Sequence, residues 1–202
     1  MITTPRNSTT TMNPTNTLSV LRRVLAVIRW PFTNRYAAPI WLLVRLYVGS
    51  IFVTMALGKI QTGFLTSDQI GPILKLVANG TITIPLPFYR DVAAMLVNLG
   101  VTPMMSFSMP FLELAVAISM FTGVLTPVAA FGALLLNINF VLSGIGNITF
   151  DGPYMVAEIL MVLAYPVVGV IGFEKLALRL ASPIVSKIPL PRRLRTALAR
   201  AS

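Results

Sequence analysis

Four long apolar segments constrain the fold of this chain more than any other feature of its sequence. They lie at about residues 40–58, 104–125, 127–146 and 153–172. A helix needs about 20 mostly apolar residues to cross the hydrocarbon core of a bilayer. Only 11% of the 202 residues are charged, against roughly 25% in soluble domains. The sequence therefore predicts an all-α integral membrane protein in which four spanning helices form a bundle.

The basic residues lie mainly at the two ends of the chain. Five arginines precede the first segment, seven basic residues follow the last, and the net charge is +10. By the positive-inside rule this predicts a multi-pass protein of the cell membrane with both termini in the cytoplasm. We expect the basic C-terminal tail to contact lipid headgroups rather than nucleic acid, because no aromatic residues are interleaved with its basic residues for base stacking.

The flanking regions differ in composition from the membrane domain, which is expected at 37–180. Residues 1–20 are rich in Thr, Asn and Ser and predict a disordered tail. Residues 21–36 place arginines among apolar residues at helical spacing, which predicts an amphipathic helix at the membrane interface. Residues 181–202 form a proline-punctuated basic tail, expected in the cytoplasm.

An external loop of about 45 residues, from Lys59 to Pro103, joins the first two predicted spans. A connection of this length usually has structure of its own. The stretches "DQIGPILKLVANG" and "PFYRDVAAMLVNLG" each indicate a short helix that ends at glycine, with "TITIPLP" extended between them. We expect these helices to form a partly apolar cap on the outer membrane surface.

The chain has neither cysteine nor histidine. This excludes a disulfide, a thiolate nucleophile and a Cys-ligated iron–sulfur cluster, as well as a His-ligated haem and an imidazole base. No glycine-rich nucleotide-binding motif is present, and no metal ligands are expected. If the protein takes part in electron transfer, the redox centre belongs to a partner or to a diffusible molecule.

Polar residues inside the predicted spans are candidates for function, because an intramembrane charge is costly unless it faces protein or water. Glu113 lies near the middle of the second span and Glu158 in the outer half of the fourth. Glu113 can serve as a neutral hydrogen-bonding acid, as a partner of Lys59 or as a proton acceptor. Arg45 lies near the inner end of the first span, where its side chain is expected to extend to the membrane surface.

Asn137 and Asn139 interrupt the apolar third segment. Being two residues apart, they point about 200° apart around a helix and cannot face the same neighbour. Either both tie the third helix to its neighbours, at about 0.6 to 2 kcal/mol per interhelical bond, or one of them reaches a pocket and hydrogen-bonds a ligand carbonyl.

Several short motifs follow one another along residues 38–180. They are Arg45-Leu46-Tyr47 and Gly58-Lys59 in the first span, Tyr89-Arg90-Asp91 in the loop, Glu113, Asn137-x-Asn139-Phe140, and Gly172-Phe173-Glu174-Lys175 after the fourth span. In this order and spacing the chain resembles the DoxD/DoxX group of membrane proteins, above all the DoxD-type subunit of thiosulfate:quinone oxidoreductases. In that group the last motif is of the Gly-x-Asp-Arg type. Here Glu174 and Lys175 stand in place of Asp and Arg and carry the same charges.

The resemblance implies a four-helix membrane bundle that works with quinone beside a small extracytoplasmic subunit. The chain is then an oxidoreductase subunit without a redox centre of its own, which passes electrons from thiosulfate or another reduced sulfur compound to membrane quinone. In this picture Glu113 exchanges protons. The quinone or substrate site draws on Lys59, Tyr89, Arg90, Asn137, Asn139 and Glu158.

Two other functions fit the same residues. The chain can be a non-catalytic accessory subunit that packs against a larger respiratory or oxidoreductase complex, which the missing redox centres favour. It can also be a small proton-linked transporter with Glu113 and Glu158 as proton sites, although it lacks the inverted repeat and broken helix pair often seen in transporters.

Overall fold

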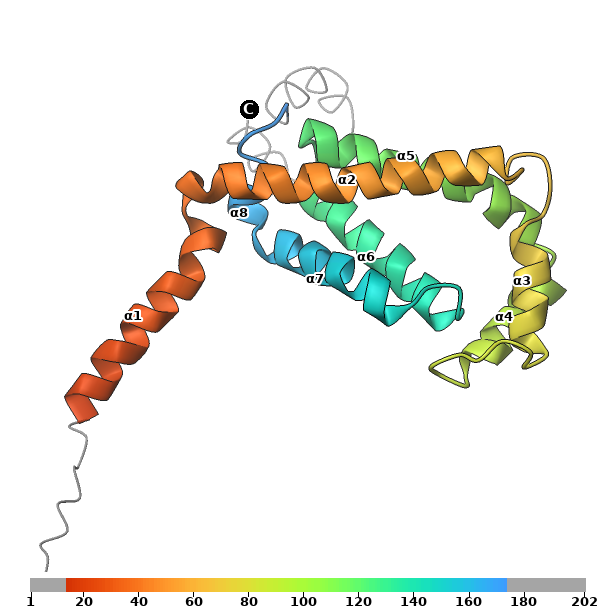
Figure 1. Ribbon diagram of the computed structural model, residues 1–202, viewed down its shortest axis with the longest axis horizontal. Helices are drawn as coiled ribbons and strands as arrows, with labels where there is room; N and C mark the ends of the chain where they lie inside the picture. Colours follow the sequence, from red (N-terminus) through yellow and green to blue (C-terminus); the bar gives the residue numbers. More distant parts are fainter. Residues whose placement is uncertain (1–13, 174–202) are drawn as a thin grey trace, which may run out of the picture.

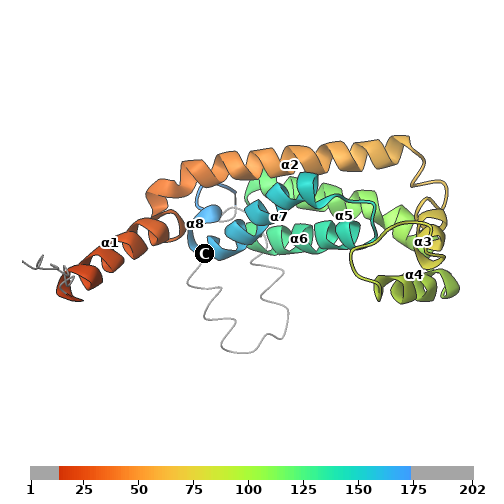
Figure 2. The ribbon, with the colours of Figure 1, turned by 60° about the horizontal axis from the view of Figure 1, so that its bottom comes forward.

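The computed structural model describes residues 14–173, without the side chains of residues 14–18 and Leu21. The described part is all-helical and contains no β-strand (Figures 1 and 2). In chain order the elements are α1 (Pro14–Thr33), the 3₁₀ turn η1 (Arg35–Ala37), α2 (Ala38–Gln61), α3 (Ile70–Ala78), α4 (Tyr89–Asn98), α5 (Thr102–Thr122), α6 (Thr126–Leu142), α7 (Ile148–Leu163) and α8 (Tyr165–Val168). The predicted all-α class is confirmed for these residues.

In the part of the chain that the structure describes, two helices are long and apolar enough to cross a membrane. One is the continuous segment Arg35–Gln61, which contains α2, and the other is α5. The helix α6 is also apolar but shorter. Length and composition thus identify two candidate spans, whereas the arrangement with four spans stays a prediction.

Four helices form the body of the molecule. The helix α2 packs along α5, α6 packs along α7, and α5 joins the two pairs through its contact with α6. In Figure 1 the pair α6–α7 runs obliquely to α2 and α5 and diverges from them toward α3 and α4. The main apolar core lies between these helices and includes Phe52, Met120 and Met161, all nearly inaccessible to solvent.

Proline and glycine set the ends of the long helices. The helices α2, α5 and α6 each have a proline at one of their first two positions, where its missing N–H costs no hydrogen bond. The helix α5 ends at Gly123, whose φ of 76° is left-handed. Leu125 also has a positive φ, 53°, so the turn into α6 is tight.

The fourth apolar segment, 153–172, is not one continuous helix in the structure. The helix α7 begins at Ile148, where the side chain of Asn147 accepts a hydrogen bond from the backbone N–H of Thr149 and caps the helix. It ends at Leu163, and the short α8 follows. Pro166 lies in the first turn of α8, and because proline lacks the N–H that would bond back to α7, the long helix stops before it.

The predicted disordered tail at 1–20 is helical over its last part, because α1 begins at Pro14. The predicted amphipathic segment 21–36 falls mainly on α1, which projects away from the bundle in Figures 1 and 2. Residues 1–13, the basic tail 181–202 and the pair Glu174-Lys175 lie outside the described residues.

The predicted cap helices are confirmed as α3 and α4, and the segment between them is not helical. Both are followed by glycine in the left-handed conformation, Gly80 with φ 74° and Gly100 with φ 67°. We call α3, α4 and their connections the cap. A second apolar cluster joins the cap to the bundle and includes Leu74 and Val77 of α3, Ala93 of α4 and Met109 of α5.

Candidate functional site

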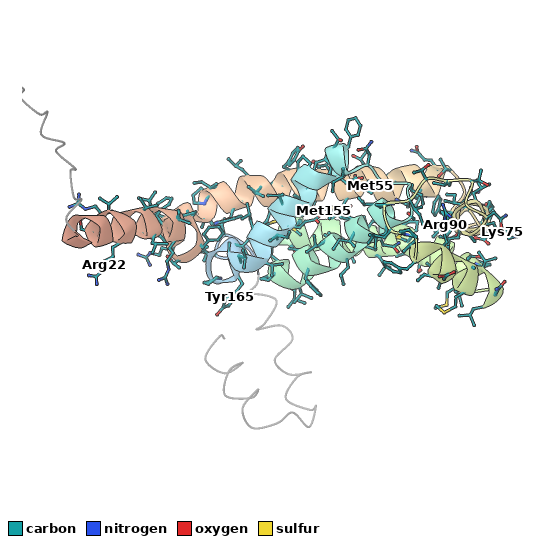
Figure 3. The ribbon with its side chains drawn as sticks, turned by 90° about the horizontal axis from the view of Figure 1, so that it is seen from below. Arg22, Met55, Lys75, Arg90, Met155 and Tyr165 are labelled. Atoms are coloured by element: carbon teal, nitrogen blue, oxygen red, sulfur yellow. The ribbon has the colours of Figure 1, made fainter. Side chains whose placement is uncertain are left out.

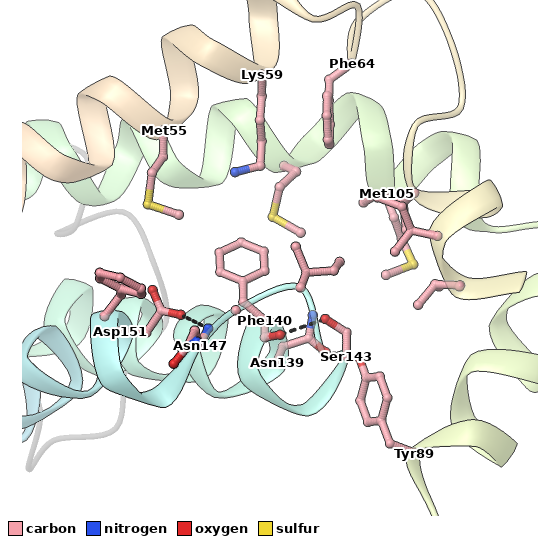
Figure 4. A pocket seen from close by; sticks show the side chains of 17 residues that line it. Met55, Lys59, Phe64, Tyr89, Met105, Asn139, Phe140, Ser143, Asn147 and Asp151 are labelled. Atoms are coloured by element: carbon pink, nitrogen blue, oxygen red, sulfur yellow. Dashed lines mark hydrogen bonds between the residues drawn. The ribbon is translucent and has the colours of Figure 1, made fainter. Parts of the chain in front are cut away.

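A pocket of about 340 Å³ lies where the cap meets the bundle (Figure 4). Its walls come from α2, α3, α4, α5, α6 and the start of α7. The apolar part of the lining includes Met55, Phe64, Met105, Met109, Phe140 and Phe150. The polar part consists of Lys59, Tyr89, Asn139, Ser143, Asn147 and Asp151. The volume and the mostly apolar lining with a few polar groups are typical of small-molecule sites.

Lys59 stands at the end of α2 and brings a positive charge to the pocket. Its Nζ donates to Oε1 of Glu113 over 2.5 Å and lies 5.0 Å from the ring centroid of Phe140. The lysine side chain is 18% exposed, whereas that of Glu113 is fully buried. Glu113 therefore stands behind Lys59 and does not line the pocket. Its second oxygen, Oε2, has no hydrogen-bond partner among the described residues.

Tyr89 and Asn139 form a second polar pair in the pocket wall. The hydroxyl of Tyr89 donates to Oδ1 of Asn139, so the cap is tied to α6 at this point. Burial raises the pKa of Tyr89 above its ordinary value, because the phenolate loses hydration. The hydroxyl thus stays protonated and keeps donating to Asn139.

A third polar group lies where α7 begins. The backbone N–H of Asn147 donates to Oδ2 of Asp151 over 2.6 Å. In Figure 4, Asp151 and Asn147 lie on one side of Phe140 and Tyr89 on the other. The pocket therefore has two polar ends separated by an aromatic ring, with Lys59 on the facing wall.

Asn137 and Glu158 form a separate buried pair between α6 and α7. Nδ2 of Asn137 donates to Oε1 of Glu158 over 2.7 Å, while Oε2 of Glu158 has no hydrogen-bond partner within residues 14–173. Neither residue lines the pocket. The two asparagines of α6 thus serve different neighbours, Asn137 bonding α7 and Asn139 bonding the cap, as their helical phase predicts.

The structure brings three of the sequence-predicted site residues together in the pocket: Lys59, Tyr89 and Asn139. Glu113 reaches the pocket only through Lys59. Arg90 is exposed on α4 beside Gly80 and is not part of the lining. Figure 3 shows it at the cap end of the molecule, near Lys75.

Arg45 does not extend to a membrane surface, as its position in the sequence had suggested. Its side chain is fully buried. Among the described residues its guanidinium donates to four backbone carbonyls: those of Met120 and Phe121 near the end of α5, of Val168 at the end of α8, and of Ile171 just after α8. The last carbonyls of a helix lack partners within it, so Arg45 satisfies the ends of two helices at once.

Sequence reasoning missed Asp68, which fastens the cap to α5. Its carboxylate accepts from the hydroxyls of Thr102 and Ser106 and from the backbone N–H of Gly71. Burial alone raises its pKa, but these hydrogen bonds together outweigh burial and hold the pKa below its ordinary value. An aspartate just before a predicted helix is the signal that could have found it.

Sequence reasoning also did not predict that Met55, Phe140 and Asp151 line one pocket.

No protein-family model, curated protein or solved structure matches this chain.

Proposed function

We propose that this chain is the membrane subunit of a quinone-linked oxidoreductase and that the pocket holds the quinone ring. The mixed lining of the pocket carries the proposal. Methionines and phenylalanines supply apolar walls, and Lys59 and Asn139 supply hydrogen-bond donors. A quinone has the same mixed character, because its ring is apolar and its two carbonyl oxygens accept hydrogen bonds.

The surface of the bundle supports four membrane-spanning helices. Each of its helices exposes large apolar side chains, among them Leu43 of α2, Phe107 of α5, Phe131 of α6 and Leu163 of α7. The ionisable groups Arg45, Glu113 and Glu158 are buried between the helices. An apolar outer surface around buried charges suits a bundle in lipid. Figure 3 is compatible with this, since Arg22 lies at one end, Lys75 and Arg90 at the other, and Met55 and Met155 between them.

The charge distribution favours cytoplasmic termini, because the basic residues gather at both ends of the chain. The cap and the pocket then lie on the extracytoplasmic side. A small partner subunit there oxidises thiosulfate or another reduced sulfur compound and supplies the electrons.

Reduction of a quinone to the hydroquinone takes up two electrons and two protons. Lys59 contacts the ligand, and Glu113 behind it has an unpartnered carboxyl oxygen that can hold a proton. In this proposal one proton passes from the ammonium group of Lys59 to a quinone oxygen and is replaced from Glu113, and the second proton is taken up from extracytoplasmic water. Lys59, Tyr89, Asn139 and Phe140 all belong to the motifs that resemble the DoxD/DoxX group, and all four line the pocket.

Photolabelling of the full-length protein in lipid nanodiscs tests the proposal. A quinone with a photoreactive group should label peptides that contain Met55 or Phe140, and excess unlabelled quinone should abolish the labelling. Lys59→Met should weaken it at least tenfold, because it removes a charged donor. Lys75→Met makes the same change on the exposed face of α3 and should leave it unchanged. Labelling confined to the outer faces of the bundle would exclude the pocket as the quinone site.

A non-catalytic accessory subunit is the second candidate function. The observation that favours it is that both buried carboxyl groups, Glu113 and Glu158, bond residues of neighbouring helices. In that case the polar pairs serve packing alone. Glu113→Gln separates the two: quinone reduction lost in an intact complex supports catalysis, and loss of the complex itself supports the accessory role.

A further inference from the structure

The Tyr89–Asn139 pair offers hydrogen-bond donors, rather than acceptors, to a ligand in the pocket. Because the tyrosine hydroxyl donates to Oδ1 of Asn139, the carbonyl of this amide is engaged. The Nδ2 group of Asn139 has two donor hydrogens, and within the described residues no hydrogen bond occupies them. Tyr89 is only 5% exposed, so the pair is held in place by its surroundings. A ligand at this end meets the donor side of the amide.

Lys59, on the facing wall, also offers only hydrogen-bond donors. An ammonium group has three donor hydrogens and no acceptor, and the structure engages it with a single carboxylate oxygen, that of Glu113. Its position 5.0 Å from the Phe140 ring centroid places it across from the residue that follows Asn139. Lys59 and Asn139 thus both bring hydrogen-bond donors to the lining of the pocket.

We propose that the pocket distinguishes the redox states of its ligand and binds an oxidised quinone more tightly than the corresponding hydroquinone. This inference rests on the proposed function. A quinone oxygen only accepts hydrogen bonds and matches the donors of Asn139 and Lys59. A hydroquinone hydroxyl also has a proton to donate, and a donor that loses its bond to water without finding an acceptor weakens binding.

The remaining acceptors of the pocket set the size of the preference. The carboxylate of Asp151 is the strongest, but it lies with Asn147 on the far side of Phe140 from Tyr89 (Figure 4). The hydroxyls of Tyr89 and Ser143 already donate to Asn139 and to the carbonyl of Phe140, and their oxygens are weaker acceptors than a carboxylate. One unmatched hydroxyl corresponds to about a tenfold difference in Kd.

A preference of this kind favours turnover. The reduced product leaves more readily than the oxidised substrate, which replaces it from the membrane pool. For a two-electron couple, a tenfold preference for the oxidised form lowers the reduction potential of the bound quinone by about 30 mV.

The test compares the Kd of a short-tailed benzoquinone with that of its hydroquinone, kept reduced without oxygen. Full-length protein in quinone-free nanodiscs is titrated with each form. We expect the quinone to bind about tenfold more tightly. Tyr89→Phe frees Oδ1 of Asn139 as an acceptor and should bring the ratio close to one, mainly through tighter hydroquinone binding. Asn139→Asp replaces the donors by an acceptor that can still receive the Tyr89 hydroxyl, and it should abolish or reverse the preference.

Tyr165→Phe is the matched control, because Tyr165 is 70% exposed on α8 and does not line the pocket; it should leave the ratio unchanged. Equal affinities of the wild-type protein for the two forms, or tighter binding of the hydroquinone, would overturn the inference while leaving quinone binding intact. If neither form binds, the proposed function fails with it.

Discussion

At the scale of residues, the ion pair between Lys59 and Glu113 links the pocket to the interior of the bundle. A buried carboxylate is costly unless a cation or several donors compensate it. Lys59 supplies that compensation and still reaches the pocket with its ammonium group. The same contact thus links α2 to α5 and places a charged donor in the pocket wall.

A double-variant experiment tests this coupling. Lys59→Met leaves Glu113 without its partner and should lower the free energy of unfolding by about 3–5 kcal/mol. Adding Glu113→Gln removes the stranded carboxylate and should recover much of that loss, whereas Lys75→Met on the surface should change stability by less than about 0.5 kcal/mol. Thermal unfolding in detergent measures the difference. A double variant no more stable than Lys59→Met alone would contradict the account.

Asp68 predicts a dependence of cap stability on pH. Its pKa is lower in the folded protein than its ordinary value of 3.8, so its contribution is complete above that value and is lost as the pH falls through the lower folded value. Asp68→Asn cannot follow this titration. At pH 6 the wild-type cap should therefore resist proteolysis better than the cap of Asp68→Asn. This difference in resistance should become smaller at pH 3. An advantage that stays constant or grows on acidification would contradict this assignment.

At the scale of elements, Arg45 ties together the ends of helices that are far apart in the sequence. It starts from α2 and reaches carbonyls of α5 and of the segment at and after α8. Gly123 makes room for it, because a Cβ at this position would lie 2.7 Å from Nη2 of Arg45. The guanidinium cannot easily move aside, since four carbonyls hold it.

Two glycine variants separate backbone strain from this contact. Gly100→Ala has a comparable positive φ, 67°, with no atom within 4 Å of the new Cβ, and should cost about 1–2 kcal/mol for the left-handed conformation alone. Gly123→Ala meets Arg45 as well and should cost about 1–3 kcal/mol more. Unfolding free energies of the two variants decide the point, and equal losses would show that Arg45 yields to the methyl group.

The elements also show what could be predicted from the sequence. Apolar length and glycine stops predicted α2, α5, α6 and both cap helices, because these signals are local. The end of α7 was missed because its apolar composition continues through Pro166 into α8. Several candidate residues were chosen because they are polar within predicted spans, and this does not tell which neighbour each side chain contacts. Of these residues, Lys59 and Asn139 line the pocket, whereas Asn137 and Glu158 form a hydrogen bond with each other outside it.

At the scale of the whole molecule, the absence of cysteine makes the membrane topology directly testable. Single cysteines at Thr33, Thr81 and Thr149 occupy exposed positions before α2, in the cap and at the start of α7. With four spans, a membrane-impermeant thiol reagent added outside should modify Thr81→Cys and Thr149→Cys in intact cells, and Thr33→Cys only after permeabilisation. If only α2 and α5 cross the membrane, Thr149→Cys should behave like Thr33→Cys.

The quinone content of the purified protein tests the central claim most directly. Full-length chain is extracted from native membranes in mild detergent, and mass spectrometry measures the quinone bound per chain. We predict close to one quinone per chain for the wild type and for Lys75→Met, and little for the variant with both Lys59→Met and Glu113→Gln, which removes the charged donor without leaving a buried charge. Equal quinone content in all three proteins, or none in the wild type, would contradict a quinone site in this pocket.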